Sequence, residues 1–175
     1  MVDTLAISVR RATPDDAPEL ADLVNDAYAI EKSFVDGERT DEDEIAAMTE
    51  NGVFLVLEQA GGLAAAVYLE RRGSVAYFGM LSVRPELQGV GLGKRLVRIA
   101  EAMAEATGAT AMTLRIINLR EELGRWYRGL GYREVGTSPY THRPLKRPCH
   151  FVDMRKDLGA GATSMAGLGA GLGAA

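Results

Sequence analysis

The strongest constraint on the fold is a sharp change in the spacing of apolar residues at Pro85. Before it, three runs rich in apolar and β-branched residues, 53–59, 63–71 and 75–83, are separated only by short glycine-containing turns. Runs of this length joined by tight turns are typical of hairpins. The sequence therefore predicts three consecutive antiparallel strands.

After Pro85 the apolar residues fall on a helical stripe, and a further strand-like run follows at 111–117. The stripe has three- and four-residue spacing and consists of Leu92, Leu96, Ile99, Ala100 and Met103. Gly108 is placed to end this helix. A strand, a helix and a strand in succession predict a right-handed parallel crossover, so the sheet is expected to be mixed.

Further elements flank this centre. We expect a strand over Leu5–Arg10, helices over Pro14–Ala29 and from Thr40 or Asp41 to Glu50, a helix capped by Asn118, and strands over Tyr132–Thr137 and Cys149–Arg155. The predicted fold class is α/β (α+β), with a mixed, mostly antiparallel, twisted sheet of about six or seven strands and about four helices. One domain is expected over 1–158, and the uncharged segment 159–175, rich in glycine and alanine, is expected to be disordered.

Composition excludes several classes of protein. A net charge of -4 argues against a nucleic-acid binder, and no apolar run approaches the roughly 18 residues that a membrane helix needs. With Cys149 as the only cysteine and only two histidines, we expect no internal disulfide and no metal site. Because the first residues lack a signal-peptide pattern, we expect a cytoplasmic protein.

A glycine-rich turn, Val83–Lys94, leaves the third strand and opens the helix. Free backbone N–H groups and the positive end of the helix dipole make such a turn an anion site. A phosphate-binding P-loop would need glycine where Gln88 stands and Ser or Thr where Arg95 stands. The dinucleotide-binding pattern also fits poorly, because the glycines are spaced G-x-G-x-G rather than G-x-G-x-x-G.

The run Gln88-Gly89-Val90-Gly91-Leu92-Gly93 resembles the Q/R-x-x-G-x-G/A motif of the GCN5-related N-acetyltransferase (GNAT) superfamily, and the order of elements agrees from about Leu5 to Leu158. The resemblance implies that backbone N–H groups across Gln88–Lys94 hold the pyrophosphate of acetyl-CoA. It also implies that the preceding strand, at Leu81, Ser82 and Val83, pairs with the pantetheine arm and binds the thioester carbonyl, where an N–H would stabilise an oxyanion.

A second signature of that superfamily is matched by Asn118, Tyr127 and the pair Gly131-Tyr132. By resemblance, Asn118 binds the pantetheine region and Tyr127 is the general acid that protonates the departing CoA thiolate. Each has a structural alternative. Asn118 is equally explained as a helix cap, and Tyr127 as a core aromatic residue beside Trp126.

Transfer to an amine also requires a base. Some members of the superfamily carry a glutamate on the strand before the glycine motif, but Tyr77 occupies that position here. Glu70 and Glu31 are the substitute candidates, although either is also explained as a surface charge. His150 is a further candidate for the base or for a substrate contact, although we favour a structural role for this histidine.

The acceptor side is characterised mainly by charge. Residues 1–80 carry 16 acidic and 6 basic side chains, whereas residues 81–175 carry 8 acidic and 14 basic ones. Many of the acids lie between Glu31 and Glu44, in the region that flanks the acceptor site in this superfamily, so a cationic amine is a candidate acceptor. The same acids are also explained as partners of a helix dipole. Tyr28, Phe34 and the loop 140–148 are candidate pocket walls.

The sequence therefore predicts an N-acetyltransferase that transfers the acetyl group of acetyl-CoA directly to a primary amine of a small molecule, peptide or protein. One alternative is an acyl-CoA-binding sensor or pseudoenzyme on the same fold, because Tyr77 replaces the commonest base. A nicotinamide-binding oxidoreductase is a more distant alternative. A homodimer is compatible with the sequence.

Overall fold

A computed structural model describes residues 6–159. Seven strands form one sheet in the order β1-β2-β3-β4-β5-β7-β6. In chain order the strands are β1 Ser8–Arg11, β2 Gly52–Gln59, β3 Gly62–Arg72, β4 Val75–Val83, β5 Ala111–Ile117, β6 Arg133–Pro139 and β7 His150–Asp157. The helices are α1 Ala17–Ala27, α2 Glu42–Thr49, α3 Leu92–Ala106 and α4 Glu121–Gly129. Among these strands only β4 and β5 pair in parallel, so the predicted fold class is confirmed.

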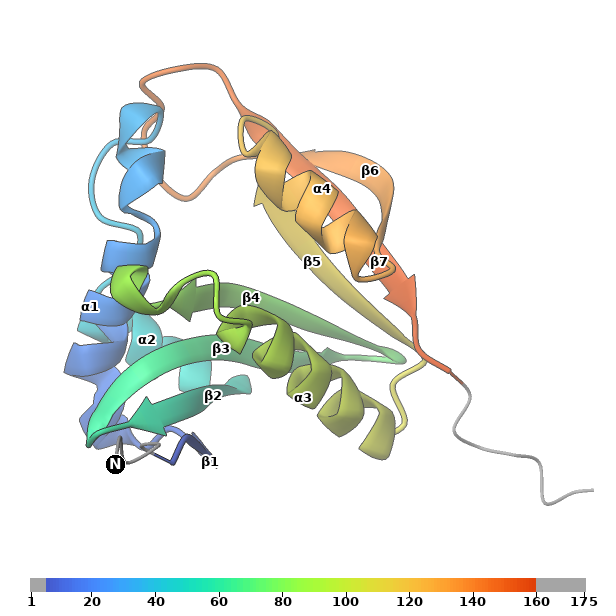
Figure 1. The fold of residues 1–175 in the computed structure, drawn as a ribbon. Helices are drawn as coiled ribbons and strands as arrows, with labels where there is room; N and C mark the ends of the chain where they lie inside the picture. The colour runs from blue at the N-terminus through green and yellow to red at the C-terminus, as the bar shows by residue number, and fades with distance from the viewer. Residues whose placement is uncertain (1–5, 160–175) are drawn as a thin grey trace, which may run out of the picture.

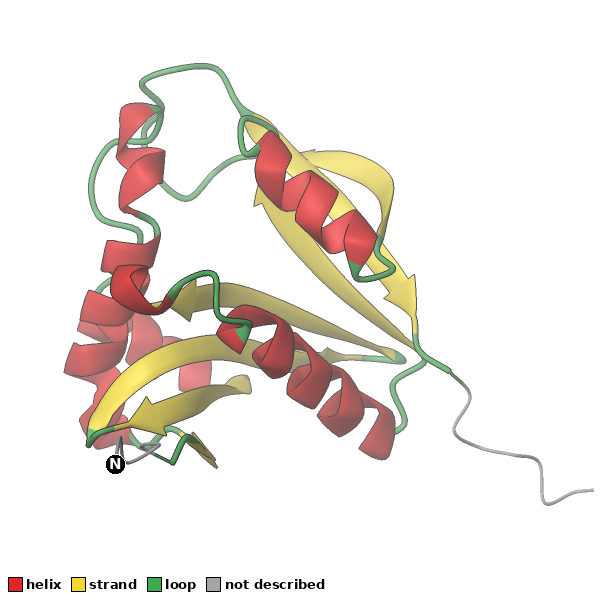
Figure 2. Ribbon diagram, viewed as in Figure 1, coloured by secondary structure: helices red, strands yellow, loops and turns green. Residues whose placement is uncertain are grey.

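Alternating side chains along β2 pack on opposite faces of the sheet. Leu55 and Leu57 join the core under α3 and α4, whereas Phe54 and Val56 join the core under α1 and α2. Successive side chains of a strand point to opposite faces, so both faces of β2 to β4 are covered by helices (Figure 2).

The sheet opens between β4 and β5, as Figure 1 shows. The parallel pairing covers only three residue pairs and ends at Tyr77 and Thr113. Beyond this point β4 contains a bulge. Gly79 pairs with Tyr68 and Ser82 pairs with Ala66, which leaves two residues of β4, Met80 and Leu81, without a partner on β3. Met80 has a φ of 52°, a strained value for a residue with a side chain.

Two loops far apart in the sequence are joined above this opening. Val35 bridges to Leu145, and backbone bonds link Asp36 N to the Pro144 carbonyl and Lys146 N to the Phe34 carbonyl. The loops therefore form one wall, which lies beside the end of the sheet at which β4 and β5 diverge (Figure 1).

Some predicted boundaries were wrong. The helix predicted over Pro14–Ala29 is a 3₁₀ turn at Pro14–Asp16, then α1, then a second 3₁₀ turn at Ala29–Ser33. The cap of α4 is Arg120 rather than Asn118, whose backbone and side chain both bond the backbone of His150 on β7. Of the predicted tail 159–175, residues 160–175 lie outside the described residues, as does Leu5 at the start of the predicted first strand.

Candidate functional site

The glycine-rich turn has the backbone shape of an anion site. Gly89 and Gly91 have φ values of 82° and 91°, and a Cβ added at either would meet no atom within 4 Å. Gly91 caps α3 and no side chain bonds the cap. The first helical bond here runs from Arg95 N to the Gly91 carbonyl, so the N–H groups of the intervening residues point out of the helix end.

This turn forms one wall of a cavity, which we call the glycine-turn cavity. Trp126 and Tyr127 of α4 form the opposite wall, and Lys94 and Arg120 contribute positive charge. Of the predicted cofactor-binding residues, the lining includes Leu81, Val83, Gln88, Gly89, Gly91, Leu92, Gly93, Lys94 and Tyr127. Val90 is 71% exposed and is not part of the lining.

The bulge on β4 lies between the glycine-turn cavity and a second cavity. Leu81 lines both of them. Ser82 lines neither, because its buried hydroxyl donates to the Met80 carbonyl at 3.0 Å and so ties the bulge together. Met80 and Leu81 have no register partner on β3, and both residues line the second cavity.

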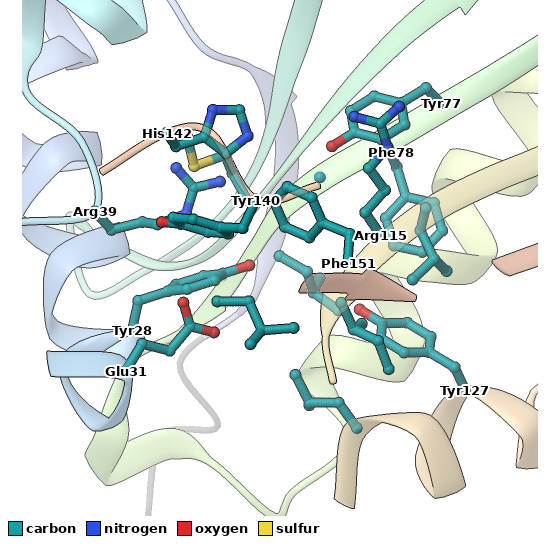
Figure 3. Close-up of a pocket in the computed structure, with 17 residues that line it drawn as sticks. Tyr28, Glu31, Arg39, Tyr77, Phe78, Arg115, Tyr127, Tyr140, His142 and Phe151 are labelled. Atoms are coloured by element: carbon teal, nitrogen blue, oxygen red, sulfur yellow. The ribbon is translucent and has the colours of Figure 1, made fainter. Parts of the chain in front are cut away.

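The second cavity lies where β4 and β5 diverge, and we call it the aromatic cavity (Figure 3). Its labelled lining residues in Figure 3 are Tyr28, Glu31, Arg39, Tyr77, Phe78, Arg115, Tyr127, Tyr140, His142 and Phe151. It shares Tyr28, Leu81, Leu123 and Tyr127 with the glycine-turn cavity. These four residues therefore mark the place where the two cavities adjoin.

Tyr127 occupies this junction. Its ring packs against Trp126, Phe78 and Tyr132, at centroid distances of 4.8, 5.9 and 5.8 Å. Its hydroxyl makes no hydrogen bond to any residue of the range 6–159, so the ring is packed while the O–H group is unused. Burial raises the pKa of the phenol well above 10, and the group is therefore protonated at neutral pH.

Glu31 is buried in the wall of the aromatic cavity and forms an ion pair with Arg120, at 3.1 Å. Burial raises the pKa of the Glu31 carboxyl, and the positive charges of Arg120 and Arg39 oppose this shift. Arg120 also bonds Glu122 and lines the glycine-turn cavity. The ion pair therefore connects the walls of the two cavities.

The other predicted site residues lie elsewhere. Glu70 lines neither cavity, and its carboxylate bonds Arg72 and Tyr68. The bond from Arg72 lowers the pKa of Glu70, which makes this carboxylate a weaker base. Asn118 faces a shallow depression beside α4, with its Oδ1 accepting from His150 N at 2.9 Å. His150 itself lines neither cavity.

The acidic residues of the N-terminal half, apart from Glu31, are not in the aromatic cavity. Glu38, Asp41, Glu42 and Glu44 surround a separate depression together with Arg143. Asp41 accepts from Glu44 N as the cap of α2, which is the role of a helix-dipole partner. The acids that suggested a cationic acceptor thus do not line the cavity that adjoins the glycine turn.

The sequence reasoning missed three arginines of the two cavities, Arg39, Arg115 and Arg120, whereas His142 belongs to the predicted wall loop 140–148. Arg120 lies just after Asn118, the expected helix cap, which was the one local signal available. Arg39 comes from a loop and Arg115 from β5, and they meet only in the folded chain.

No helix among residues 6–159 is long and apolar enough to cross a membrane. No group of three or more His, Cys, Asp or Glu side chains in the same range is placed to hold a metal ion.

Known proteins share this architecture. The structure of yncA, a putative acetyltransferase from Salmonella typhimurium with its cofactor acetyl-CoA, has a TM-score of 0.71 at 21% identity, covering 90% of this chain and 96% of that one. The ribosomal-protein-S18-alanine N-acetyltransferase from Escherichia coli has a TM-score of 0.70 at 20% identity, covering 95% and 100%. An N-acetyltransferase from Staphylococcus aureus Mu50 has a TM-score of 0.72 at 16% identity, covering 87% and 99%.

No curated protein sequence matches the chain. The family model described as an acetyltransferase (GNAT) domain matches residues 21–158, which is most of the sequence. The chain therefore belongs to the GNAT acetyltransferase family.

Proposed function

We propose that this protein transfers the acetyl group of acetyl-CoA directly to a primary amine, at the junction of the two cavities. The observation that carries the proposal is the shared lining of Tyr28, Leu81, Leu123 and Tyr127. One cavity has the backbone features of an anion site, the other contains a buried carboxylate, and these four residues line both. Such an arrangement suits two substrates that must react with each other.

The glycine-turn cavity fits acetyl-CoA. Gly89 and Gly91 leave open space where a side chain would point, so a pyrophosphate can approach the backbone. The uncapped start of α3 and Lys94 supply N–H donors and positive charge. When bound, acetyl-CoA supplies the thioester carbonyl carbon that the amine attacks. The backbone N–H of Leu81, a residue with no register partner on β3, is our candidate donor to the thioester oxygen.

Glu31 is our candidate base. An amine of the lysine type has a pKa near 10.4 and must lose a proton before it can attack. Burial raises the pKa of Glu31, which makes the ionised carboxylate a better proton acceptor than an exposed glutamate. Its ion pair with Arg120 keeps the carboxylate oriented and ionised in a buried wall.

Tyr127 is our candidate proton donor. Because its hydroxyl has no partner among the described residues, it is free to donate to the sulfur of the departing thiolate. Burial raises the pKa of the phenol, but a thiolate released in the same buried place is destabilised for the same reason. The pKa values of the phenol and of the CoA thiol therefore stay close enough for a hydrogen bond from Tyr127 to stabilise the departing thiolate.

An assay of CoA release with a panel of primary amines tests the proposal. The chain should release CoA and form the N-acetylated amine in equal amounts. Binding of acetyl-CoA can be followed separately through the fluorescence of Trp126, which is the only tryptophan and lines the glycine-turn cavity. Tight binding without acetylation of any amine would favour the acyl-CoA sensor instead.

A further inference from the structure

Arg39 in the aromatic cavity is not used by the proposed reaction. Its guanidinium makes no hydrogen bond or ion pair with any residue from 6 to 159, and it lies 5.5 Å from the centre of the Tyr28 ring. The other two arginines near the site differ in this respect. Arg115 pairs with Asp153 at 3.1 Å, and Arg120 pairs with Glu31. Arg39 thus supplies a positive charge that is held in no ion pair, since the nearby carboxylate of Glu31 is already paired with Arg120.

The hydroxyl of Tyr140 is also unused. Tyr140 is 9% exposed, and its oxygen is fully buried with no hydrogen-bond partner among residues 6–159. Leaving a buried hydroxyl unpaired destabilises a folded protein, so native structures rarely do so without a reason. A ligand atom that accepts this O–H bond would remove the cost.

These two groups lie at the same end of the cavity. Figure 3 shows Arg39, Tyr140 and His142 together, with Tyr127 at the opposite side. The ring of Tyr140 packs on His142 and Phe151 at centroid distances of 5.6 and 5.0 Å, which fixes the direction of its hydroxyl. The two joined loops position this set, because Arg39 comes from one loop and the other two residues come from the second.

The charge at this end suits a single negative charge. Burial, together with nearby Arg39, lowers the pKa of His142, so the imidazole is neutral at neutral pH. The nearby carboxylate of Glu31 is neutralised by its ion pair with Arg120, so one guanidinium, one hydroxyl donor and one neutral imidazole remain for a ligand. A carboxylate matches this set, since a guanidinium can donate two parallel bonds to it. A phosphate dianion would leave one charge uncompensated.

We propose that Arg39 and Tyr140 bind a carboxylate of the acceptor, so that the acceptor is an amine that also carries a carboxylate, as an amino acid does. This inference rests on the proposed acetyl transfer. The amine of such a molecule would lie beside Glu31, toward the junction with the glycine-turn cavity, and its carboxylate would lie against Arg39 and Tyr140. The acceptor class differs from the cationic amine that the acidic sequence segment suggested.

Matched pairs of amines test the inference. Initial rates of CoA release are measured for L-phenylalanine against phenethylamine and phenylalaninamide, and for 5-aminopentanoate against pentylamine. Within at least one set, kcat/KM should be roughly ten- to a hundredfold higher for the carboxylate, which is the size expected for hydrogen bonds to a charged group. Equal or better turnover of the amines that lack a carboxylate overturns the inference and leaves the proposed acetyl transfer intact.

Two variants test whether Arg39 and Tyr140 cause the preference for amines that carry a carboxylate. Arg39→Gln and Tyr140→Phe should each lower kcat/KM for the carboxylate by about tenfold or more and leave that of phenethylamine or pentylamine within about twofold. Tyr140→Phe should not lower the melting temperature, because it removes a hydroxyl that lacks a partner. Arg125→Gln is the control, since Arg125 is an exposed residue of α4 that pairs only with Glu121 within the described chain.

A binding measurement tests the carboxylate site even if no amine is acetylated. Calorimetric titration of the CoA-bound protein with L-phenylalanine and 5-aminopentanoate, and with their amines, measures the same preference without turnover. If the carboxylates bind, and Arg39→Gln weakens that binding, the carboxylate site is supported even when no amine is acetylated. Absence of binding by both carboxylates would contradict it.

Discussion

The substitution Tyr127→Phe separates a catalytic role of the hydroxyl from a packing role of the ring. The ring contacts with Trp126, Phe78 and Tyr132 are all available to phenylalanine. The hydroxyl makes no hydrogen bond within residues 6–159. The free energy of unfolding should therefore change by less than about 0.5 kcal/mol, because no bond is lost and no cavity larger than one oxygen is created.

The effect on turnover follows from the proposed hydrogen bond to the thiolate. A hydrogen bond to a charged group contributes about 1.5–3 kcal/mol. If that bond is formed only as the thiolate leaves, its loss raises the barrier by this amount, which lowers kcat roughly ten- to a hundredfold. The affinity for acetyl-CoA, measured by Trp126 fluorescence, should stay within about twofold.

Tyr132→Phe is the matched control. Tyr132 packs beside Tyr127, but its hydroxyl donates to Glu101 at 2.7 Å. This variant should lose about 0.5–1.5 kcal/mol of stability and keep its turnover, the reverse of Tyr127→Phe. Thiol release under saturating substrates and urea unfolding provide the two measurements. A kcat for Tyr127→Phe within twofold of the unmodified protein would refute the donor role.

Three further changes test other parts of the site. Gly91→Glu should lower the affinity for acetyl-CoA by a hundredfold or more, because it puts a negative charge at the proposed pyrophosphate site; Gly73→Glu, another glycine with positive φ and open space, should leave titrations of Trp126 fluorescence unchanged. In pH–rate measurements, kcat/KM should fall as the pH drops through the raised pKa of Glu31, above its ordinary 4.5, and Glu31→Gln should remove this limb along with most of the activity. Gly52→Ala should lower stability by about 1–3 kcal/mol in urea unfolding, because its Cβ would press on the Leu69 carbonyl and the Tyr68 ring, and an unchanged midpoint would show that β2 and β3 adjust.

The order and type of the central elements could be predicted from the sequence because they depend on local patterns. The run 111–117 is β5 with the predicted bounds, and the run 75–83 is β4. The insertion of β7 between β5 and β6 left no local signal, since it is set by long-range pairing. The bulge at Met80 was also missed, because an unstrained strand and a bulged one have the same apolar alternation.

The glycine-turn cavity and the aromatic cavity also differ in how far each could be predicted from the sequence. The glycine-rich turn is contiguous in the chain, so its spacing could be interpreted directly. The aromatic cavity is assembled from separate segments, and its polar residues meet only after folding. Burial also changes which carboxylate is favoured as a base. The sequence alone gives no reason to prefer Glu31 or Glu70 as the base. In the structure Glu31 is buried in the cavity wall and pairs with Arg120, whereas Glu70 is bonded to Arg72.

The most direct test of acetyl transfer at the cavity junction is detection of both products. Purified protein is incubated with acetyl-CoA and the amine panel, and free CoA and N-acetylated amine are quantified together by mass spectrometry. Acetyl transfer predicts equal amounts of the two with at least one amine, and loss of both in Gly91→Glu. Acetyl-CoA binding with no acetylated amine, or acetylation that Gly91→Glu leaves unchanged, would contradict it.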